Sequence, residues 1–396
     1  MIQPAFKKPQ SINTFPTELT TIIAANLSYN TCRSCALLSR DWFEVTRPET
    51  FRYLRNGYCD ELDFQEFTDF LRDSLYIRQY VRELCLWNKE REFVLQASLL
   101  YPLLQLLPKL KIITCNDSKF SLNPRPLDVI PTPISLHRLD FSIRGKYFRS
   151  PGLIDCLRLF STIEELRINL FTMSSNYNTY QLTEDTFKQF PISHLEVKSI
   201  DIQGWCADDT ARFMADLLSK TQTVHSLRSL RYFCGSDNHE HTLEYFIRKV
   251  GRNLHHCDLT LLPYALHHDE GALESVAWKF ISTCTSLMSF TLRGVVTRDL
   301  WRSFMEILLK VPRSCRAFTF VINHPYGDRV RVSELGLLDW VRTEDILAKF
   351  TKIKQVSFLV DGTERERDEV GSIVKENLPN LQRRGLLHFG IVPKYQ

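Results

Sequence analysis

A short pattern of apolar positions, apolar-x-x-apolar-x-apolar, recurs along the chain from residue 81 onward. Its last three positions alternate between apolar and variable residues, which predicts a short strand with one buried face. The middle apolar residues of the ten copies are Leu84, Leu110, Leu139, Leu166, Leu195, Leu230, Cys257, Phe290, Phe318 and Val356, and a degraded copy lies near residues 381–389. Ten copies 26 to 38 residues apart indicate a repeat array.

Between several copies the apolar spacing becomes helical. One-sided apolar stripes occupy residues 208–224 (Phe213, Leu217, Leu218, Val224), 240–254 (Leu243, Phe246, Ile247, Val250) and 298–311 (Leu300, Phe304, Ile307, Leu308, Val311). Alternating strands and helices predict right-handed parallel crossovers. We therefore expect residues 55–396 to form an α/β solenoid, a leucine-rich-repeat horseshoe of ten to eleven irregular repeats with strands inside and helices outside. The alternative is an ordinary α/β domain with fewer strands.

Residues 12–54 carry a helical pattern without strands, and residues 1–11 are expected to be a flexible terminus. The pattern predicts a first helix that opens at Phe15–Glu18 and carries Leu19, Ile22, Ile23 and Leu27 on one side, a second from Cys32 to about Leu38 capped by residues 28–31, and a third from Arg40 to about Thr46 that Pro48 stops. The result is a small all-α module ahead of the array.

This module has more large apolar side chains than it can bury. About forty residues form a marginal fold, because they remove little surface from water. A fully buried Leu, Ile or Phe contributes about 1.5–3 kcal/mol, and three short helices cannot cover all of those present. We therefore predict a docking surface for a helix of another protein. In the alternative, the helices only cap the first repeat.

The same segment carries a family resemblance. It combines a Pro-x-Glu opening at residues 16–18, aliphatic residues at helical spacing, ALLSRDW at 36–42 and FRYL at 51–54. It resembles an F-box of the kind abundant in mushroom-forming fungi. The resemblance implies docking onto the Skp-type adaptor of an SCF ubiquitin ligase, and through it onto a cullin. The implied adaptor-binding residues are Phe15, Pro16, Leu19, Ile22, Ile23, Leu27, Leu37, Leu38 and Trp42.

Residues that alternate with the apolar anchors would face the concave side of the horseshoe. The candidates for binding the substrate protein are Trp87, Lys111, Asp140, Arg167, Glu196, Arg231, Phe233, Asp258 and Arg293. The charges in the central row alternate in sign, which favours a folded protein or a peptide over a polyanion. The alternative is a solvated sheet face whose charges pair with one another at little gain in stability.

Composition narrows the partners and the compartment. The net charge is +4 without a dense basic block, so nucleic acid is not an indicated partner. The longest apolar stretch, residues 94–107, is short of the roughly 20 residues that cross a bilayer, and the first residues lack a signal peptide. We therefore expect a soluble protein of the cytoplasm, the nucleus or both, with no membrane partner and with its 11 cysteines as free thiols.

The sequence gives no pattern that indicates an enzyme, a cofactor or a metal. Cys32-x-x-Cys35 lacks the second pair of a zinc site. The histidines at 239–241, 255–256 and 267–268 form no H-E-x-x-H motif, and phosphate-binding and nucleophile-elbow motifs are absent. The sequence thus predicts a non-enzymatic substrate receptor of an SCF-type ligase. A repeat scaffold outside any ligase is the alternative.

Overall fold

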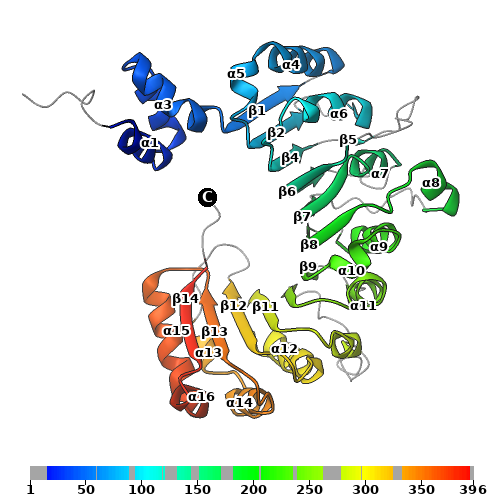
Figure 1. The fold of residues 1–396 in the computed structure, drawn as a ribbon. Helices are drawn as coiled ribbons and strands as arrows, with labels where there is room; N and C mark the ends of the chain where they lie inside the picture. Colours follow the sequence, from blue (N-terminus) through cyan, green and yellow to red (C-terminus); the bar gives the residue numbers. More distant parts are fainter. Residues whose placement is uncertain are drawn as a thin grey trace, which may run out of the picture.

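A long parallel sheet dominates the computed structural model, which describes residues 16–392 except 59, 89–93, 118, 121–131, 144–150, 171–181, 205–206, 235–238, 262–277, 296 and 324–331. Within these residues twelve strands form one sheet, in chain order, and each pairs with its neighbours in parallel. Figure 1 shows the sheet lining the inside of an arc, with helices along the outside. The predicted α/β architecture, with parallel strands inside and helices outside, is confirmed.

The strands and helices alternate along most of the chain. The strands of the large sheet are β1 (Tyr53–Tyr58), β2 (Glu83–Asn88), β4 (Ile112–Asn116), β6 (Ile134–Ile143), β7 (Phe160–Leu170), β8 (Glu196–Gly204), β9 (Ser229–Cys234), β10 (His256–Leu261), β11 (Ser289–Val295), β12 (Ala317–Asn323), β13 (Gln355–Val360) and β14 (Leu387–Ile391), and β3 (Val94–Leu95) and β5 (Lys119–Phe120) form a separate pair. The helices are α1 (Thr17–Ala25), α2 (Tyr29–Ala36), α3 (Arg40–Thr50), α4 (Glu61–Asp73), α5 (Leu75–Arg78), α6 (Ala97–Gln105), α7 (Pro151–Leu157), α8 (Glu184–Gln189), α9 (Ala207–Leu218), α10 (Thr223–Ser226), α11 (His239–Val250), α12 (Arg298–Lys310), α13 (Val332–Leu335), α14 (Trp340–Ala348), α15 (Glu364–Asn377) and α16 (Pro379–Arg383), with a short 3-10 helix at Lys279–Thr283. In the part of the chain that is described, no helix has both the length and the apolar character needed to cross a bilayer.

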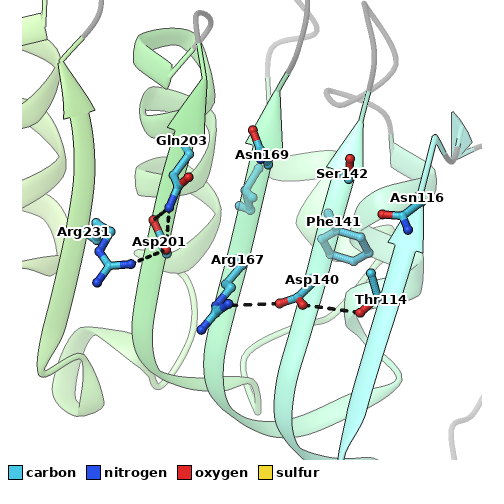
Figure 2. A pocket seen from close by; sticks show the side chains of 11 residues that line it. Thr114, Asn116, Asp140, Phe141, Ser142, Arg167, Asn169, Asp201, Gln203 and Arg231 are labelled. Carbon is cyan, nitrogen blue, oxygen red and sulfur yellow. Dashed lines mark hydrogen bonds and ion pairs between the residues drawn. The ribbon is translucent and has the colours of Figure 1, made fainter. Parts of the chain in front are cut away.

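The strands pair in one continuous register, so that each contributes one middle anchor to a row that crosses the sheet. The row runs Leu54, Leu84, Ile113, Leu139, Leu166, Ile200, Leu230, Cys257, Phe290, Phe318, Val356 and Leu387. Eight of the ten predicted middle anchors occupy it. The residue after each anchor points to the concave face, and Figure 2 shows four of these side by side on β6 to β9.

Two predicted middle anchors are wrong. The row is occupied by Ile113 where Leu110 was expected, and by Ile200 where Leu195 was expected. Both segments contain two overlapping copies of the apolar pattern, because the last or middle residue of the first copy begins the second. The chain uses the second copy as the strand, and it buries Leu110 and Leu195 in the turn that enters the strand.

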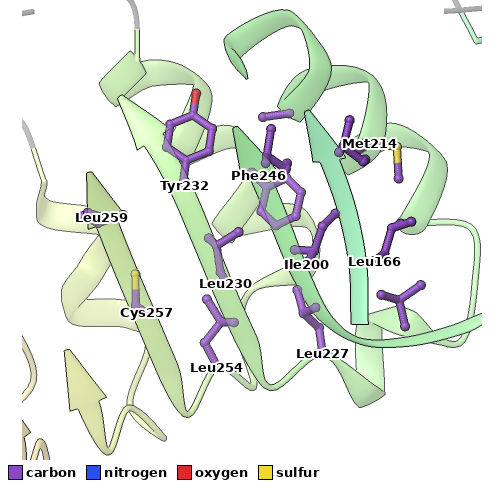
Figure 3. Close-up of a cluster of buried hydrophobic side chains, with 14 of the residues drawn as sticks. Leu166, Ile200, Met214, Leu227, Leu230, Tyr232, Phe246, Leu254, Cys257 and Leu259 are labelled. Carbon is purple, nitrogen blue, oxygen red and sulfur yellow. The ribbon is translucent and has the colours of Figure 1, made fainter. Parts of the chain in front are cut away.

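The core fills the space between the sheet and the outer helices. The predicted stripes of α9, α11 and α12 are buried, apart from the half-buried Val224. Figure 3 shows anchors of β7 to β10, among them Leu166 and Ile200, in one layer with Met214 of α9 and Phe246 of α11. The layer is continuous along the array, so each repeat completes the core of its neighbours.

The first three helices pack around small side chains. Ala24, Cys32 and Thr46 are fully buried at their centre, and the Cys32 thiol lies 3.5 Å from the Ala24 carbonyl oxygen. Ser28 caps α2, as predicted, by accepting a hydrogen bond from the backbone of Thr31. The expectation that Pro48 stops the third helix is wrong, because α3 continues through it to Thr50. A proline this close to the end of a helix removes a hydrogen bond only from the last turn.

Candidate functional site

The first three helices expose a group of large aliphatic side chains. Leu19, Ile22 and Ile23 of α1 are between 42% and 59% exposed. Leu37 and Leu38, in the turn between α2 and α3, are 88% and 68% exposed. Since the interior of the three helices is filled by small residues, these larger side chains have no place inside it. We call Leu19, Ile22, Ile23, Leu37 and Leu38 the N-terminal apolar face.

The other predicted adaptor-binding residues take different positions. Pro16 is exposed at the start of α1, whereas Leu27 and Trp42 are half-buried. Phe15 lies outside the described residues. Five of the nine candidates therefore form the N-terminal apolar face, and Pro16 adjoins it through α1.

The end of α3 attaches these helices to the array. The Arg47 guanidinium lies 4.7 Å from the centre of the Phe43 ring and 5.8 Å from that of Tyr76 in α5. Arg52 forms an ion pair with Glu83 of β2 at 3.2 Å, and its carbonyl oxygen accepts hydrogen bonds from the backbone of residues 82 and 83. The attachment runs through α3, and Figure 1 shows α1 on the side away from the sheet.

On the concave face, successive strands place charged residues of alternating sign in one row. The row contains Asp140 on β6, Arg167 on β7, Asp201 on β8, Arg231 on β9 and Asp258 on β10. The predicted alternation is therefore present, with Asp201 in the position expected for Glu196. We call these five residues the charge row.

Arg231 joins the second half of the charge row. Its Nη1 lies 3.3 Å from a carboxylate oxygen of Asp201, and its Nε donates to Asp258 at 3.1 Å. Asp258 also accepts from Arg293 at 2.8 Å, and Asp201 from the Gln203 amide at 2.9 Å. Each charge here is therefore balanced by a neighbour on the sheet.

The first half of the row is paired more loosely. Arg167 donates from Nε and Nη2 to the two carboxylate oxygens of Glu165 on its own strand, at 2.9 and 3.0 Å. Its Nε is 4.0 Å from Asp140, which pairs at 3.1 Å with Arg138 and accepts a weak hydrogen bond from Thr114 at 3.4 Å. The Oδ1 atom of Asp140 is covered and accepts no hydrogen bond.

Burial perturbs two carboxyl groups of the row. Burial raises the pKa of Asp140, and the guanidinium groups of Arg138 and Arg167 lower it only in part. Burial likewise raises the pKa of Asp201, against the lowering effect of Arg231. In both cases the loss of hydration outweighs the attraction of the neighbouring cations.

A pocket of about 380 Å³ opens over this part of the sheet. It is lined by Thr114, Asn116, Asp140, Phe141, Ser142, Arg167, Ile168, Asn169, Asp201, Gln203 and Arg231. Figure 2 shows the charged side chains toward one end of the strands and the amide side chains of Asn116, Asn169 and Gln203 toward the other. The volume is within the range of about 300–1,000 Å³ typical of ligand sites. We call it the concave pocket.

Of the remaining residues predicted for the concave face, two lie where they were expected and two do not. Trp87 lies on the concave face of β2, where the Arg55 guanidinium covers its ring at 4.7 Å, and Phe233 is half-buried on β9. The positions predicted for Lys111 and Glu196 are wrong. Lys111 precedes β4, and Glu196 begins β8 beside a different hollow.

The residues that take their places were missed at the sequence level. They are Thr114 and Asp201, which directly follow the anchors of β4 and β8, and Asn116 and Gln203 two residues further along each strand. The second of the overlapping apolar patterns in each segment would have identified all four. No protein-family model matches this chain, and no curated protein matches it in sequence. Function is therefore inferred from the chain's own residues and geometry.

Proposed function

We propose that this protein is an F-box and leucine-rich-repeat substrate receptor of an SCF-type ubiquitin ligase, acting in the cytoplasm or the nucleus. Helices α1 to α3 dock onto a Skp-type adaptor, and through it onto a cullin. The concave sheet binds the protein to be ubiquitinated. The chain itself catalyses nothing. It accelerates transfer by holding the substrate close to the loaded ubiquitin carrier, which makes the encounter effectively intramolecular.

The N-terminal apolar face carries this proposal. Leu19, Ile22 and Ile23 recur at the spacing by which one side of a helix enters an apolar groove. Full burial of a Leu or Ile side chain is worth about 1.5–3 kcal/mol, and these side chains are roughly half exposed. A partner helix packed across them, and across Leu37 and Leu38, would bury the surface that is still exposed and so gain the remaining part of that free energy.

The scaffold alternative fits this geometry less well. Helices that only cap the first repeat would turn their large apolar side chains toward it. Instead, Arg47 of α3 and Arg52, just after that helix, contact the array, and Phe51 packs against its core. The large side chains of Ile22 and Ile23 of α1 stay exposed. The F-box resemblance of residues 12–54 supports the same choice.

The concave face supports the second part of the proposal. Its charges are balanced by their neighbours, so the face has little attraction for a polyanion such as nucleic acid. Its pocket and its polar side chains suit a folded protein or peptide, whose recognition needs oriented donors and acceptors.

Co-expression of the full chain with a Skp-type adaptor tests the proposal. We expect a complex that survives size-exclusion chromatography. Ile23→Asp and Ile22→Asp should each abolish it, because each places a charge in the apolar interface. The matched control is Val341→Asp, since Val341 is an exposed apolar residue of the distant α14.

Each outcome of this experiment separates the two candidate functions. Loss of the complex in the α1 variants but not in the control supports the receptor. A wild-type chain that stays monodisperse and ignores the adaptor overturns it and favours the scaffold. A complex that tolerates both α1 substitutions also overturns the proposed docking face.

A further inference from the structure

Three turns at the C-terminal end of the array lie next to one another at one edge of the sheet. They are residues 311–316, 349–354 and 384–386, which lead into β12, β13 and β14, the three strands shown side by side in Figure 1. The backbone N–H of Lys354 donates to the carbonyl oxygen of Arg316 at 2.7 Å, and that of Val356 donates to Leu386 at 2.8 Å. Stacking of the repeats therefore brings the three turns together at this edge.

The three turns expose basic side chains and contain no aspartate or glutamate. Their exposed basic residues, which we call the basic edge, are Arg313, Arg316, Lys349, Lys352, Lys354 and Arg384. The Arg313 guanidinium lies 5.0 Å from the centre of the Phe350 ring, so the first two turns are in direct contact. Because the six residues come from three separate segments, no single stretch of sequence shows a basic block. The fold gathers them.

The described residues of the protein leave the basic edge without a counter-charge. None of its six residues forms an ion pair within the part of the chain that the structure describes. An earlier repeat differs: Lys198 precedes its strand anchor by two residues, as Arg316 and Lys354 do, but it pairs with Glu164 at 2.6 Å. Arg316 and Lys354 belong to neighbouring strands, which are about 4.8 Å apart. Their like charges repel each other, and a bound anion would relieve that repulsion.

The surroundings of the basic edge favour an acidic protein segment over a nucleic acid. The only aromatic residue of the three turns, Phe350, is 1% exposed, so the turns offer no ring on which a base could stack. Three adjacent strands span only about 10 Å, a width that a short peptide can cross. The same strands continue from this edge onto the concave face, where we expect the substrate to bind. A segment of a protein bound there can therefore reach the basic edge.

We propose that the basic edge binds an acidic segment, rich in aspartate and glutamate, of the protein that lies on the concave face. This inference rests on the proposed function and assigns a charge to one part of the substrate. The carboxylates pair with the exposed lysine and arginine side chains, and the field of the unpaired cations steers the segment toward them. A single exposed ion pair contributes little, so the edge selects a run of carboxylates over an isolated one.

Fluorescence anisotropy of end-labelled, capped peptides titrated with the full-length protein tests this inference. The probes are octaglutamate, octaglutamine as its uncharged match, and a single-stranded DNA nonamer, whose phosphates give the same number of charges as octaglutamate. We expect octaglutamate to bind at least about tenfold tighter than octaglutamine, with an affinity that falls as salt is added. The DNA nonamer should bind no tighter than octaglutamate, because the turns provide no stacking platform.

Variants of the basic edge locate the effect. The double variant Arg316→Glu/Lys354→Glu should weaken octaglutamate binding by about tenfold or more, because it replaces two attractive charges with repulsive ones. Both side chains are exposed, so the substitutions leave the core intact. The matched control is Lys188→Glu/Arg248→Glu, which changes the net charge equally at residues of α8 and α11 that are 76% and 72% exposed. It should leave the affinity for octaglutamate unchanged.

Equal binding of octaglutamate and octaglutamine would overturn the inference, and so would equal weakening in the edge variant and the control. A DNA nonamer that binds tighter than octaglutamate, and loses that binding in the edge variant, would overturn the choice of an acidic protein segment in favour of a nucleic acid. The adaptor experiment is independent, since the basic edge adjoins β12 to β14 and the docking helices are α1 to α3. A protein that forms the adaptor complex but does not prefer octaglutamate loses only this inference.

Discussion

Removing Arg231 should destabilise the fold more than removing either carboxylate that it bridges. In Arg231→Met the Asp258 carboxylate keeps its hydrogen bond from Arg293 at 2.8 Å. Asp201, only 4% exposed, keeps only the Gln203 amide. The methionine retains much of the buried aliphatic stem, so the main change is an uncompensated charge at Asp201.

The magnitude follows from the degree of burial. Removing one partner of a fully buried ion pair costs about 3–5 kcal/mol. Arg231 retains 28% of its side-chain exposure, so water offsets part of that loss. We expect a loss of about 2 kcal/mol in the free energy of unfolding at neutral pH. Asp201→Asn should change it by less than about 1 kcal/mol, because the desolvation that raises the pKa of Asp201 disappears together with the ion pair.

Urea denaturation of the full chain at several pH values measures both effects. Since the folded-state pKa of Asp201 lies above the ordinary value of 3.8, the folded state binds this proton more tightly than the unfolded state. The contribution of Asp201 to stability therefore falls as pH rises from 3.8 through its raised pKa. In Arg231→Met that pKa should rise further, so the deficit relative to wild type should shrink on acidification. A deficit that is independent of pH, or an Asp201→Asn variant less stable than Arg231→Met, would refute this reasoning.

Three further substitutions test the packing of the array. Gly294→Ala should lower the free energy of unfolding by about 1–3 kcal/mol, because a Cβ there would lie 2.9 Å from the Leu261 carbonyl oxygen; thermal denaturation measures this, and an unchanged melting temperature contradicts it. Phe320→Ala should cost about 3–5 kcal/mol, since its ring stacks on Phe358 at 5.1 Å in the buried core; a loss below that of Gly294→Ala would argue against a continuous core. Thr363→Ala removes the capping box of α15 and should cost about 1 kcal/mol, seen as faster amide exchange in its first turn alone.

The sequence was sufficient to predict the alternation of strands and helices along the array, but it missed β1 and the β3–β5 pair, and it did not fix the position of every strand. Period-two segments are recognisable because one face of each strand must be buried. Where Leu195 and Ile200 both fit an overlapping pattern, the two choices place different residues on the concave face. Only pairing with β7 and β9 selects Ile200, and pairing between repeats is not encoded within a single segment. The error therefore moved one acidic residue of the charge row from Asp201 to Glu196.

The local apolar pattern also could not predict which side chains of the first three helices point outward. The pattern did predict that these helices have more large apolar side chains than they can bury among themselves. Which of them turn outward depends on what fills the centre, and small residues such as Cys32 and Thr46 do so. A pattern of apolar positions treats Leu19 and Ala24 alike, whereas packing separates them by size. The exposed face thus required three-dimensional structure.

The continuous register also has a consequence for the proposed binding of a substrate by the concave face. Because parallel strands place equivalent residues at the same height, one polar position in each repeat becomes a row across the whole face. Within the row, Asp201 and Asp258 pair with Arg231, and Asp140 pairs with the adjoining Arg138. In the proposed receptor, a ligand that brings an unmatched charge to this face would have to disrupt those pairs. Specificity then comes as much from the cost imposed on wrong partners as from attraction to the right one.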